Sequence, residues 1–165
     1  MNERYYVAYG SNLNIAQMCQ RCPQSIPVAS YYLNDWRLLF KGSKTGNYLT
    51  IEPAKDSRVP VVVYKISESD EKALDRYEGY PHFYYKKKFT FLKKANGTSE
   101  PKECFAYIMD ERRKIGIPSV HYIQVCREGY KDYGLDMKYL DEAIRYSTEH
   151  AYKYSGEQER LWDEW

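Results

Sequence analysis

The chain has no long hydrophobic run. No stretch approaches the roughly 20 consecutive apolar residues that a membrane-spanning helix needs. The opening residues, MNERYYV, lack the apolar segment of a secretory signal peptide. These two absences predict a protein that neither spans a membrane nor is exported, and we expect it in the cytoplasm.

The chain also has little net charge and few residues suited to holding a metal. The 25 Lys and Arg nearly balance the 23 Asp and Glu, and the formal charge of +2 does not by itself indicate a nucleic-acid partner. Cys19 and Cys22 have the spacing of half a zinc site or a redox pair, but Cys104 and Cys126 form no second pair. The three histidines show no ligand spacing either. We therefore expect reduced structural thiols, no metal site and no cofactor.

What the chain has in quantity is tyrosine. Its 165 residues suit one domain, which we place at residues 1–155, with residues 156–165 as a C-terminal tail. Apolar residues make up 43% and charged residues 29%, as in ordinary globular proteins. Each of the 19 tyrosines joins a large apolar ring to one hydroxyl, which suits half-wet cavities as well as cores.

The order of the expected elements indicates an α+β fold, because strands come first with helices interspersed and two helices follow at the end. Runs of β-branched and aromatic residues predict the strands, and apolar residues spaced three and four apart predict the helices. Ser67 and Asp70 form a capping-box signal at the start of the second helix, and Gly79 is a typical residue for its end. The expected strands are 4–9, 27–40 (one strand or a strand pair), 47–53, 59–66, 83–92 and 103–109, and the expected helices are 14–21, 67–77, 119–131 and 136–152.

The segment YVAYGSNL, residues 6–13, runs from a strand directly into Gly10, Ser11 and Asn12. A strand that turns sharply into a helix leaves the first N–H groups of that helix unpaired, and small residues let a ligand approach them. The corner could therefore hold a carboxylate, or the oxyanion that develops during acyl transfer. The alternative is that Ser11 or Asn12 only caps the following helix.

The segment LDRYEGYP, residues 74–81, places Glu78 four residues after Leu74, on the same face of the expected helix. Leu74 needs the core and draws Glu78 toward it, and the last turn of a helix disfavours a negative charge. Both effects raise the pKa of the Glu78 carboxyl, which makes this group a candidate general base and acid. The alternative is a surface glutamate at a frayed helix end.

Three segments in order, YVAYGSNL, LDRYEGYP and PSVHYIQVCREGYKDYGLD, resemble the γ-glutamylcyclotransferase family. This family includes the γ-glutamylamine cyclotransferases and their bacterial relatives, often described as AIG2-like. The resemblance extends from Tyr6 to about Asp136. It implies a small mixed β-barrel flanked by helices, which composition and periodicity do not show.

Enzymes of this family cyclise a γ-glutamyl group: the α-amine attacks the γ-carbonyl, 5-oxoproline forms, and the amine of the original amide leaves. The resemblance implies that Glu78 moves the protons as general base and acid, and that no metal or cofactor takes part. It also implies a small-molecule γ-glutamyl substrate, whose leaving group could be an amine or an amino acid.

The resemblance further implies a set of substrate-binding residues. Period-two reading of the strand puts Tyr84 on the face opposite Phe83 and Tyr85, and Tyr85 takes its role if the register differs by one. Tyr9 could instead pack beneath the corner, and Tyr122 could be a core residue near Cys126. The substrate-binding residues are Tyr9, Gly10, Ser11, Asn12, Leu13, Tyr84 and Tyr122. We expect residues 83–88 and the DERRKIGIP segment, residues 110–118, to form the specificity wall.

Two other functions stay possible on sequence grounds. The lysines between Lys86 and Lys94, interleaved with aromatic residues, could form a nucleic-acid-binding hairpin, although the low net charge leads us to expect no nucleic-acid partner. A non-catalytic relative could bind a small γ-glutamyl-like ligand, although a simple binder has no need of a carboxylate at Glu78. We expect a monomer or a homodimer.

Overall fold

The computed structural model describes residues 2–43 and 45–163. Strands and helices alternate along the chain, and the predicted α+β class is confirmed. In chain order the elements are β1 (Arg4–Ala8), the 3-10 turn η1 (Ser11–Leu13), α1 (Ile15–Arg21), β2 (Ile26–Ser43), β3 (Gly46–Ile66), α2 (Glu68–Glu78), β4 (Tyr84–Ala95), β5 (Thr98–Met109), β6 (Lys114–Ile115), α3 (Val120–Asp132) and α4 (Lys138–Asp163).

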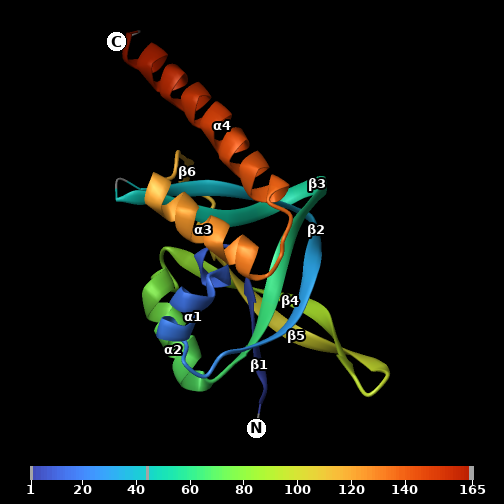
Figure 1. Ribbon diagram of the computed structural model, residues 1–165. Coiled ribbons are helices and arrows are strands. Elements are labelled where there is room, and N and C mark those ends of the chain that lie inside the picture. The colour runs from blue at the N-terminus through green and yellow to red at the C-terminus, as the bar shows by residue number, and fades with distance from the viewer. Residues whose placement is uncertain (1, 44, 164–165) are drawn as a thin grey trace.

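Within the described residues, six strands form one mixed sheet in the order β4-β5-β1-β3-β2-β6. β1 pairs parallel with β5, and the remaining neighbours pair antiparallel. The sheet curls into a half-barrel, from which the β4–β5 hairpin extends (Figure 1). The helices lie around this curled sheet, as the resemblance implied.

The two strands expected at 47–53 and 59–66 are in fact one strand, β3, which pairs with β2 along almost its whole length. The polar stretch between them bends the ribbon without interrupting it. Asp35 and Asp56 adopt left-handed φ values of 64° and 65°, and the register shifts next to Asp35. The Asp56 N–H donates to the Asp35 carboxylate at 3.1 Å. A bulge of this kind reads as a strand break in sequence because its residues are polar and turn-like.

The last helix is longer than expected. α4 continues to Asp163 and does not end at Tyr152, so the expected tail is helical as far as Asp163, and residues 164–165 lie outside the described residues. The C-terminal half of α4 projects away from the rest of the protein (Figure 1).

The middle of the sheet forms the core. Val7 and Ala8 of β1 are neighbours that point to opposite faces, and both side chains have no exposed area. Val59, Val61 and Val63 of β3 are equally inaccessible. β1 is therefore covered on both faces, and its end at Ala8 delivers the chain into the interior of the protein.

The ends of α2 follow the sequence signals. The Asp70 N–H donates to the Ser67 hydroxyl at 3.0 Å, and the Ser67 N–H donates to the Asp70 carboxylate at 3.1 Å, which completes the predicted capping box. Gly79 follows the helix with a left-handed φ of 63°. These local signals make Glu78 the last residue of α2.

α3 packs directly on the corner that follows β1. A Cβ atom added to Gly129 would lie 2.6 Å from the backbone nitrogen of Asn14 and 2.7 Å from the carbonyl carbon of Leu13. Only a glycine lets the helix approach this closely, so Gly129 places α3 against η1.

Candidate active site

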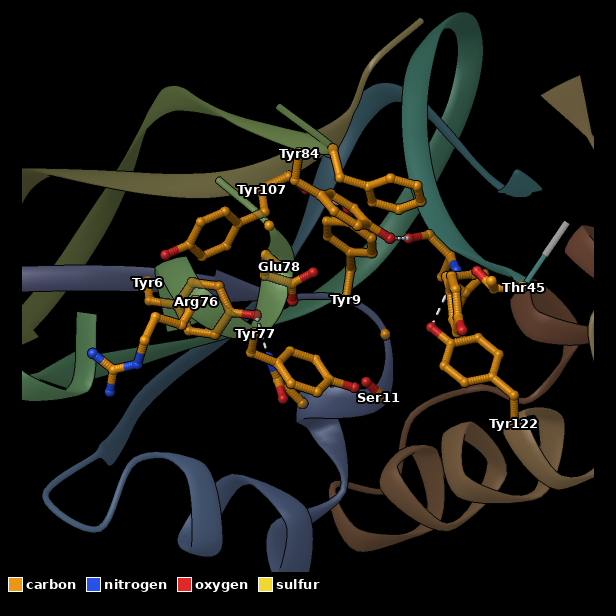
Figure 2. A pocket seen from close by; sticks show the side chains of 16 residues that line it. Tyr6, Tyr9, Ser11, Thr45, Arg76, Tyr77, Glu78, Tyr84, Tyr107 and Tyr122 are labelled. Atoms are coloured by element: carbon orange, nitrogen blue, oxygen red, sulfur yellow. Dashed lines mark hydrogen bonds between the residues drawn. The ribbon is translucent and has the colours of Figure 1, made fainter. Parts of the chain in front are cut away.

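A cavity of about 360 Å³ lies where β1 ends, bordered by η1, the C-terminal end of α2 and the start of α3 (Figure 2). Its volume falls in the range of small-molecule sites. Seven of its lining residues are tyrosines, so the walls are aromatic rings that carry hydroxyl groups. The lining residues are Tyr6, Tyr9, Gly10, Ser11, Asn12, Thr45, Tyr48, Leu49, Arg76, Tyr77, Glu78, Gly79, Phe83, Tyr84, Tyr107 and Tyr122.

Glu78 brings the carboxylate into this cavity. Leu74, one turn earlier on α2, has no exposed area and anchors this face of the helix in the core. Within the described residues the Glu78 carboxyl has neither a hydrogen bond nor an ion pair, and Figure 2 shows it among the rings of Tyr6, Tyr9 and Tyr77. Burial raises its pKa to about 7, against the opposing effect of the Arg21 charge. The carboxyl is therefore divided between its acid and base forms near neutral pH.

The corner after β1 is a single 3-10 turn. The Leu13 N–H donates to the Gly10 carbonyl and the Asn14 N–H to the Ser11 carbonyl, both at 3.0 Å. No acceptor is found among the described residues for the N–H groups of Ser11 and Asn12. Both residues line the cavity, so the turn offers two free backbone donors there.

The alternative in which Ser11 or Asn12 caps the first helix is wrong. The cap is Asn14, whose side-chain oxygen accepts from the Gln17 N–H at 3.1 Å. The Asn12 side chain makes other hydrogen bonds: its nitrogen donates to the Tyr6 hydroxyl at 2.9 Å, and its oxygen accepts from Arg21. The Asn12 side chain thus orients the turn.

One member of the predicted binding set does not line the cavity. Leu13 has no exposed area and lies beneath the turn, against Gly129 of α3. Its N–H is already used by the Gly10 carbonyl. Leu13 therefore anchors the turn from below, because the 3-10 geometry points its apolar side chain into the core.

Gly10 allows close packing at the start of the turn. A Cβ atom added here would lie 3.3 Å from the Leu49 Cβ and 3.6 Å from the Tyr122 hydroxyl. A side chain at this position would also reduce the space of the cavity that Gly10 lines.

Two tyrosine hydroxyls bind the backbone of Leu49. Tyr84 donates to the Leu49 carbonyl at 2.9 Å, and the Tyr122 hydroxyl accepts from the Leu49 N–H at 3.1 Å. The hydroxyl of Tyr9 donates to the carbonyl of Tyr107. These bonds, drawn in part in Figure 2, fix the rings as rigid walls.

The register of β4 places Tyr84, and not Tyr85, in the cavity. Tyr85 lies outside it, and its hydroxyl donates to Glu111. Phe83 also lines the cavity although period-two reading put it on the other face, because β4 begins only at Tyr84. Tyr122 fills both of its possible roles, since it lines the cavity and packs edge-on against Phe40.

Burial raises the pKa of every phenol in these walls that shows a shift, and the nearby Glu78 charge acts in the same direction. The phenols therefore remain neutral around neutral pH and keep their hydroxyl hydrogens. The tyrosines concerned are Tyr6, Tyr9, Tyr77, Tyr84, Tyr107 and Tyr122.

Sequence reasoning missed several cavity residues. Tyr77 directly precedes Glu78 in the motif, so its position was the available signal. Nothing local marks Tyr6, Tyr107 or Tyr48, because strands from three parts of the chain bring them together. The DERRKIGIP segment was expected to form part of the wall, but residues 110–118 do not line the cavity. Thr45 and Tyr48, at the β2–β3 turn, lie there instead.

The lysines of the β4–β5 hairpin and the cysteines, which suggested other functions, have these surroundings in the described residues. Lys86 lies 3.0 Å from Glu71 and 2.9 Å from Asp75, and Lys88 lies 3.4 Å from Glu103. Neighbouring carboxylates thus offset part of the positive charge of the hairpin. All four cysteines are free thiols, and no group of three His, Cys, Asp or Glu side chains in this part of the chain could hold a metal.

No helix in the described ranges is both long enough and apolar enough to cross a membrane.

Known proteins resemble this chain over most of its length. A family model described as "Gamma-glutamyl cyclotransferase, AIG2-like" matches residues 6–124. The γ-glutamylcyclotransferase of Bos taurus is 32% identical over 143 residues, which cover 81% of this chain and 73% of that protein. The Homo sapiens γ-glutamylcyclotransferase is 30% identical over 146 residues, covering 83% of this chain and 75% of that protein.

Solved structures agree with the sequence comparison. A structure named "Gamma-glutamyl cyclotransferase" superposes with a TM-score of 0.71 at 25% identity, and the match covers 86% of each chain. The curled mixed sheet with its flanking helices is thus the fold that the resemblance implied. From the span of the family model and the identity to its named relatives, the chain belongs to the γ-glutamyl cyclotransferase, AIG2-like family.

Proposed function

We propose that the protein releases 5-oxoproline and a free amine or amino acid from a γ-glutamyl compound, with Glu78 as general base and acid. The observation that carries this proposal is the unpaired Glu78 carboxyl in the cavity, whose pKa burial raises to about 7. A group with a pKa near the working pH can both accept and return a proton.

The reaction asks for Glu78 to move one proton from the attacking nitrogen to the leaving nitrogen. The α-ammonium first gives a proton to solvent, and the neutral α-amine attacks the γ-carbonyl carbon. As the new C–N bond forms and closes the five-membered ring, the Glu78 carboxylate takes a proton from the attacking nitrogen. The protonated Glu78 then gives this proton to the leaving nitrogen as the original amide C–N bond breaks. The ring nitrogen keeps one hydrogen, as 5-oxoproline requires, and the released amine takes up one proton from solvent, so atoms and charges balance.

The turn at Gly10, Ser11 and Asn12 supplies the complementary charge. The free N–H groups of Ser11 and Asn12 belong to residues that line the cavity, where they can donate to the γ-glutamyl group. Donors of this type bind either its α-carboxylate or the oxyanion that forms on the γ-carbonyl. Because they belong to the backbone, they are already placed before the substrate arrives.

The tyrosine walls supply shape. Tyr9, Tyr84 and Tyr122 are each tied to backbone groups, so their rings limit how the glutamyl chain can fold. Holding the amine and the carbonyl carbon in contact is worth on the order of 7–11 kcal/mol in well-oriented intramolecular reactions. This accounts for how a site with one ionisable catalytic group could be sufficient.

The test is release of 5-oxoproline from a panel of γ-glutamyl-amino acids and γ-glutamylamines. Glu78→Gln keeps the size of the side chain and is expected to lose nearly all turnover while still binding substrate. Glu68→Gln is the matched control, because Glu68 lies on the same helix with its side chain 67% exposed. It should retain wild-type activity.

Release by the wild type and the control, but not by Glu78→Gln, would support the proposal, and the preferred substrate would identify the leaving group. Substantial turnover by Glu78→Gln would show that another group moves the protons. Binding of γ-glutamyl compounds by the wild type without any release would point to a non-catalytic relative.

A further inference from the structure

Arg21 joins two parts of the site without lining the cavity itself. It is the last residue of α1 and is half-buried. Its guanidinium donates to the side-chain oxygen of Asn12 and, at 3.4 Å, to the Ser11 hydroxyl. The same guanidinium stacks on the Tyr77 ring, with 3.4 Å between its central carbon and the ring centroid. One side chain thus connects the turn after β1 to the end of α2.

We propose that Arg21 is a positioning residue for the reaction, holding the turn and Tyr77 around Glu78 and supplying the positive charge that acts on that carboxylate. This inference rests on the proposed function for the reaction that Arg21 serves. The contacts themselves do not depend on it, since they are made by α1, η1 and α2 without any ligand.

The geometry suits an arginine in particular. A planar guanidinium can stack on a ring and donate hydrogen bonds from its edge at the same time, whereas a lysine ammonium is a compact charge without a face. Asn12 uses its other side-chain atom on the Tyr6 hydroxyl, so Arg21 extends a chain of contacts from α1 to β1. Loss of the guanidinium would release the turn and the Tyr77 ring together.

The charge of Arg21 is the one that acts on Glu78. Arg76 also lines the cavity, but its guanidinium turns away from Glu78 (Figure 2). Asp75 is held by Lys86 at 2.9 Å and by the Tyr107 hydroxyl at 2.6 Å. The other titratable groups that face Glu78 are phenols, which stay neutral because burial raises their pKa: Tyr6, Tyr9, Tyr77, Tyr84, Tyr107 and Tyr122.

The sign of the effect follows from the charges. A positive charge stabilises the ionised carboxylate, so Arg21 lowers the pKa of Glu78 from the value that burial alone would produce. Without it, the base form of Glu78 would be available only at higher pH. The acidic limb of the kcat/KM profile should therefore move upward when the charge is removed.

Two substitutions separate charge from geometry. Arg21→Gln removes the charge, and we expect the acidic limb of kcat/KM to move up by about one pH unit. Arg21→Lys keeps the charge but cannot stack and bridge at once. We expect its acidic limb to stay near that of the wild type, while kcat/KM falls by about tenfold across the pH range, mainly through KM.

A second readout does not need turnover. NMR titration of the glutamate side-chain carboxyl carbons follows Glu78 directly, with its signal assigned by its loss in Glu78→Gln. The midpoint should rise in Arg21→Gln and stay near the wild-type value in Arg21→Lys. If the wild type releases no 5-oxoproline, the proposed function fails, and this titration still tests the action of Arg21 on Glu78.

Arg127→Gln is the control for loss of one positive charge, because Arg127 lies on α3 outside the cavity lining and pairs with Asp141 at 2.8 Å. Arg127→Gln should leave unchanged both the acidic limb of the kcat/KM profile and the midpoint of the Glu78 titration. The proposal would be overturned if Arg21→Gln, still folded by its melting curve, titrated as the wild type does. It would also be overturned if a folded Arg21→Lys matched the wild type in kcat/KM. Should Arg21→Gln fail to fold, the Arg21→Lys comparison decides alone.

Discussion

Replacing Glu78 by glutamine should make the protein more stable at high pH. The wild-type carboxyl must lose its solvation on folding, and its pKa rises from 4.5 to about 7 as a result. Below pH 4.5 the group is protonated in both the folded and the unfolded state, so burial of the charge costs nothing. As the pH rises from 4.5 to about 7, the unfolded chain ionises first, and the folded state loses stability relative to it.

The size of the effect follows from the pKa difference. A change from 4.5 to about 7 corresponds to about 3 kcal/mol, since each pKa unit is worth about 1.4 kcal/mol. Part of Glu78 stays exposed to solvent, which screens the charge and lowers the expected effect to about 2 kcal/mol. Glutamine has nearly the same shape and no charge to bury, so Glu78→Gln should gain this amount above neutral pH and little in acid.

Urea unfolding of the two proteins at a series of pH values measures the difference directly. The difference in free energy of unfolding should be small at about pH 4 and should grow to about 2 kcal/mol at about pH 8. Glu68→Gln, which removes an exposed carboxylate, should follow the wild type within about 0.5 kcal/mol. A Glu78→Gln protein that is no more stable than the wild type at high pH would refute the claim that this carboxyl is buried and unpaired.

Three further substitutions test the walls and the turn. Gly129→Ala gains up to about 1 kcal/mol of helix propensity, but its Cβ would lie 2.6 Å from the Asn14 nitrogen. We therefore expect the free energy of unfolding, measured by thermal unfolding, to fall by about 1–2 kcal/mol, and product binding to weaken. An unchanged melting temperature would contradict this. Tyr84→Phe leaves the Leu49 carbonyl without its donor and should cost about 1–3 kcal/mol of stability in urea unfolding. Ser11→Ala keeps the backbone N–H and should lower kcat/KM by less than about tenfold, whereas a loss as large as that of Glu78→Gln would assign the binding to its hydroxyl.

Some features of this protein follow from residues that lie close together in the chain. Ser67, Asp70 and Gly79 set both ends of α2, because capping bonds and a left-handed C-terminal residue act over only a few positions. Leu74 then turns Glu78 toward the interior, since residues four apart share one face. The raised pKa of Glu78 could be expected from the sequence for this reason.

The bend in the β2–β3 ribbon shows where such local reasoning fails. Asp56 and its neighbours look like a loop in sequence, yet they continue a strand because β2 lies opposite and carries a matching bulge at Asp35. Propensity records the preference of one segment by itself, whereas the partner strand decides whether that segment pairs.

The sequence by itself determined the turn, the helix and the carboxylate that the helix carries. The tertiary structure alone decided which further tyrosines join Tyr9, Tyr84 and Tyr122 in the cavity wall, that Leu13 lies beneath the turn, and that Arg21 stacks on Tyr77. The Tyr9 hydroxyl meets a carbonyl 98 residues away, and Tyr122 meets a backbone N–H 73 residues away. Caps and turns are satisfied within one stretch of chain, but a cavity wall forms only when distant segments pack, and only that packing selects which side chains face it.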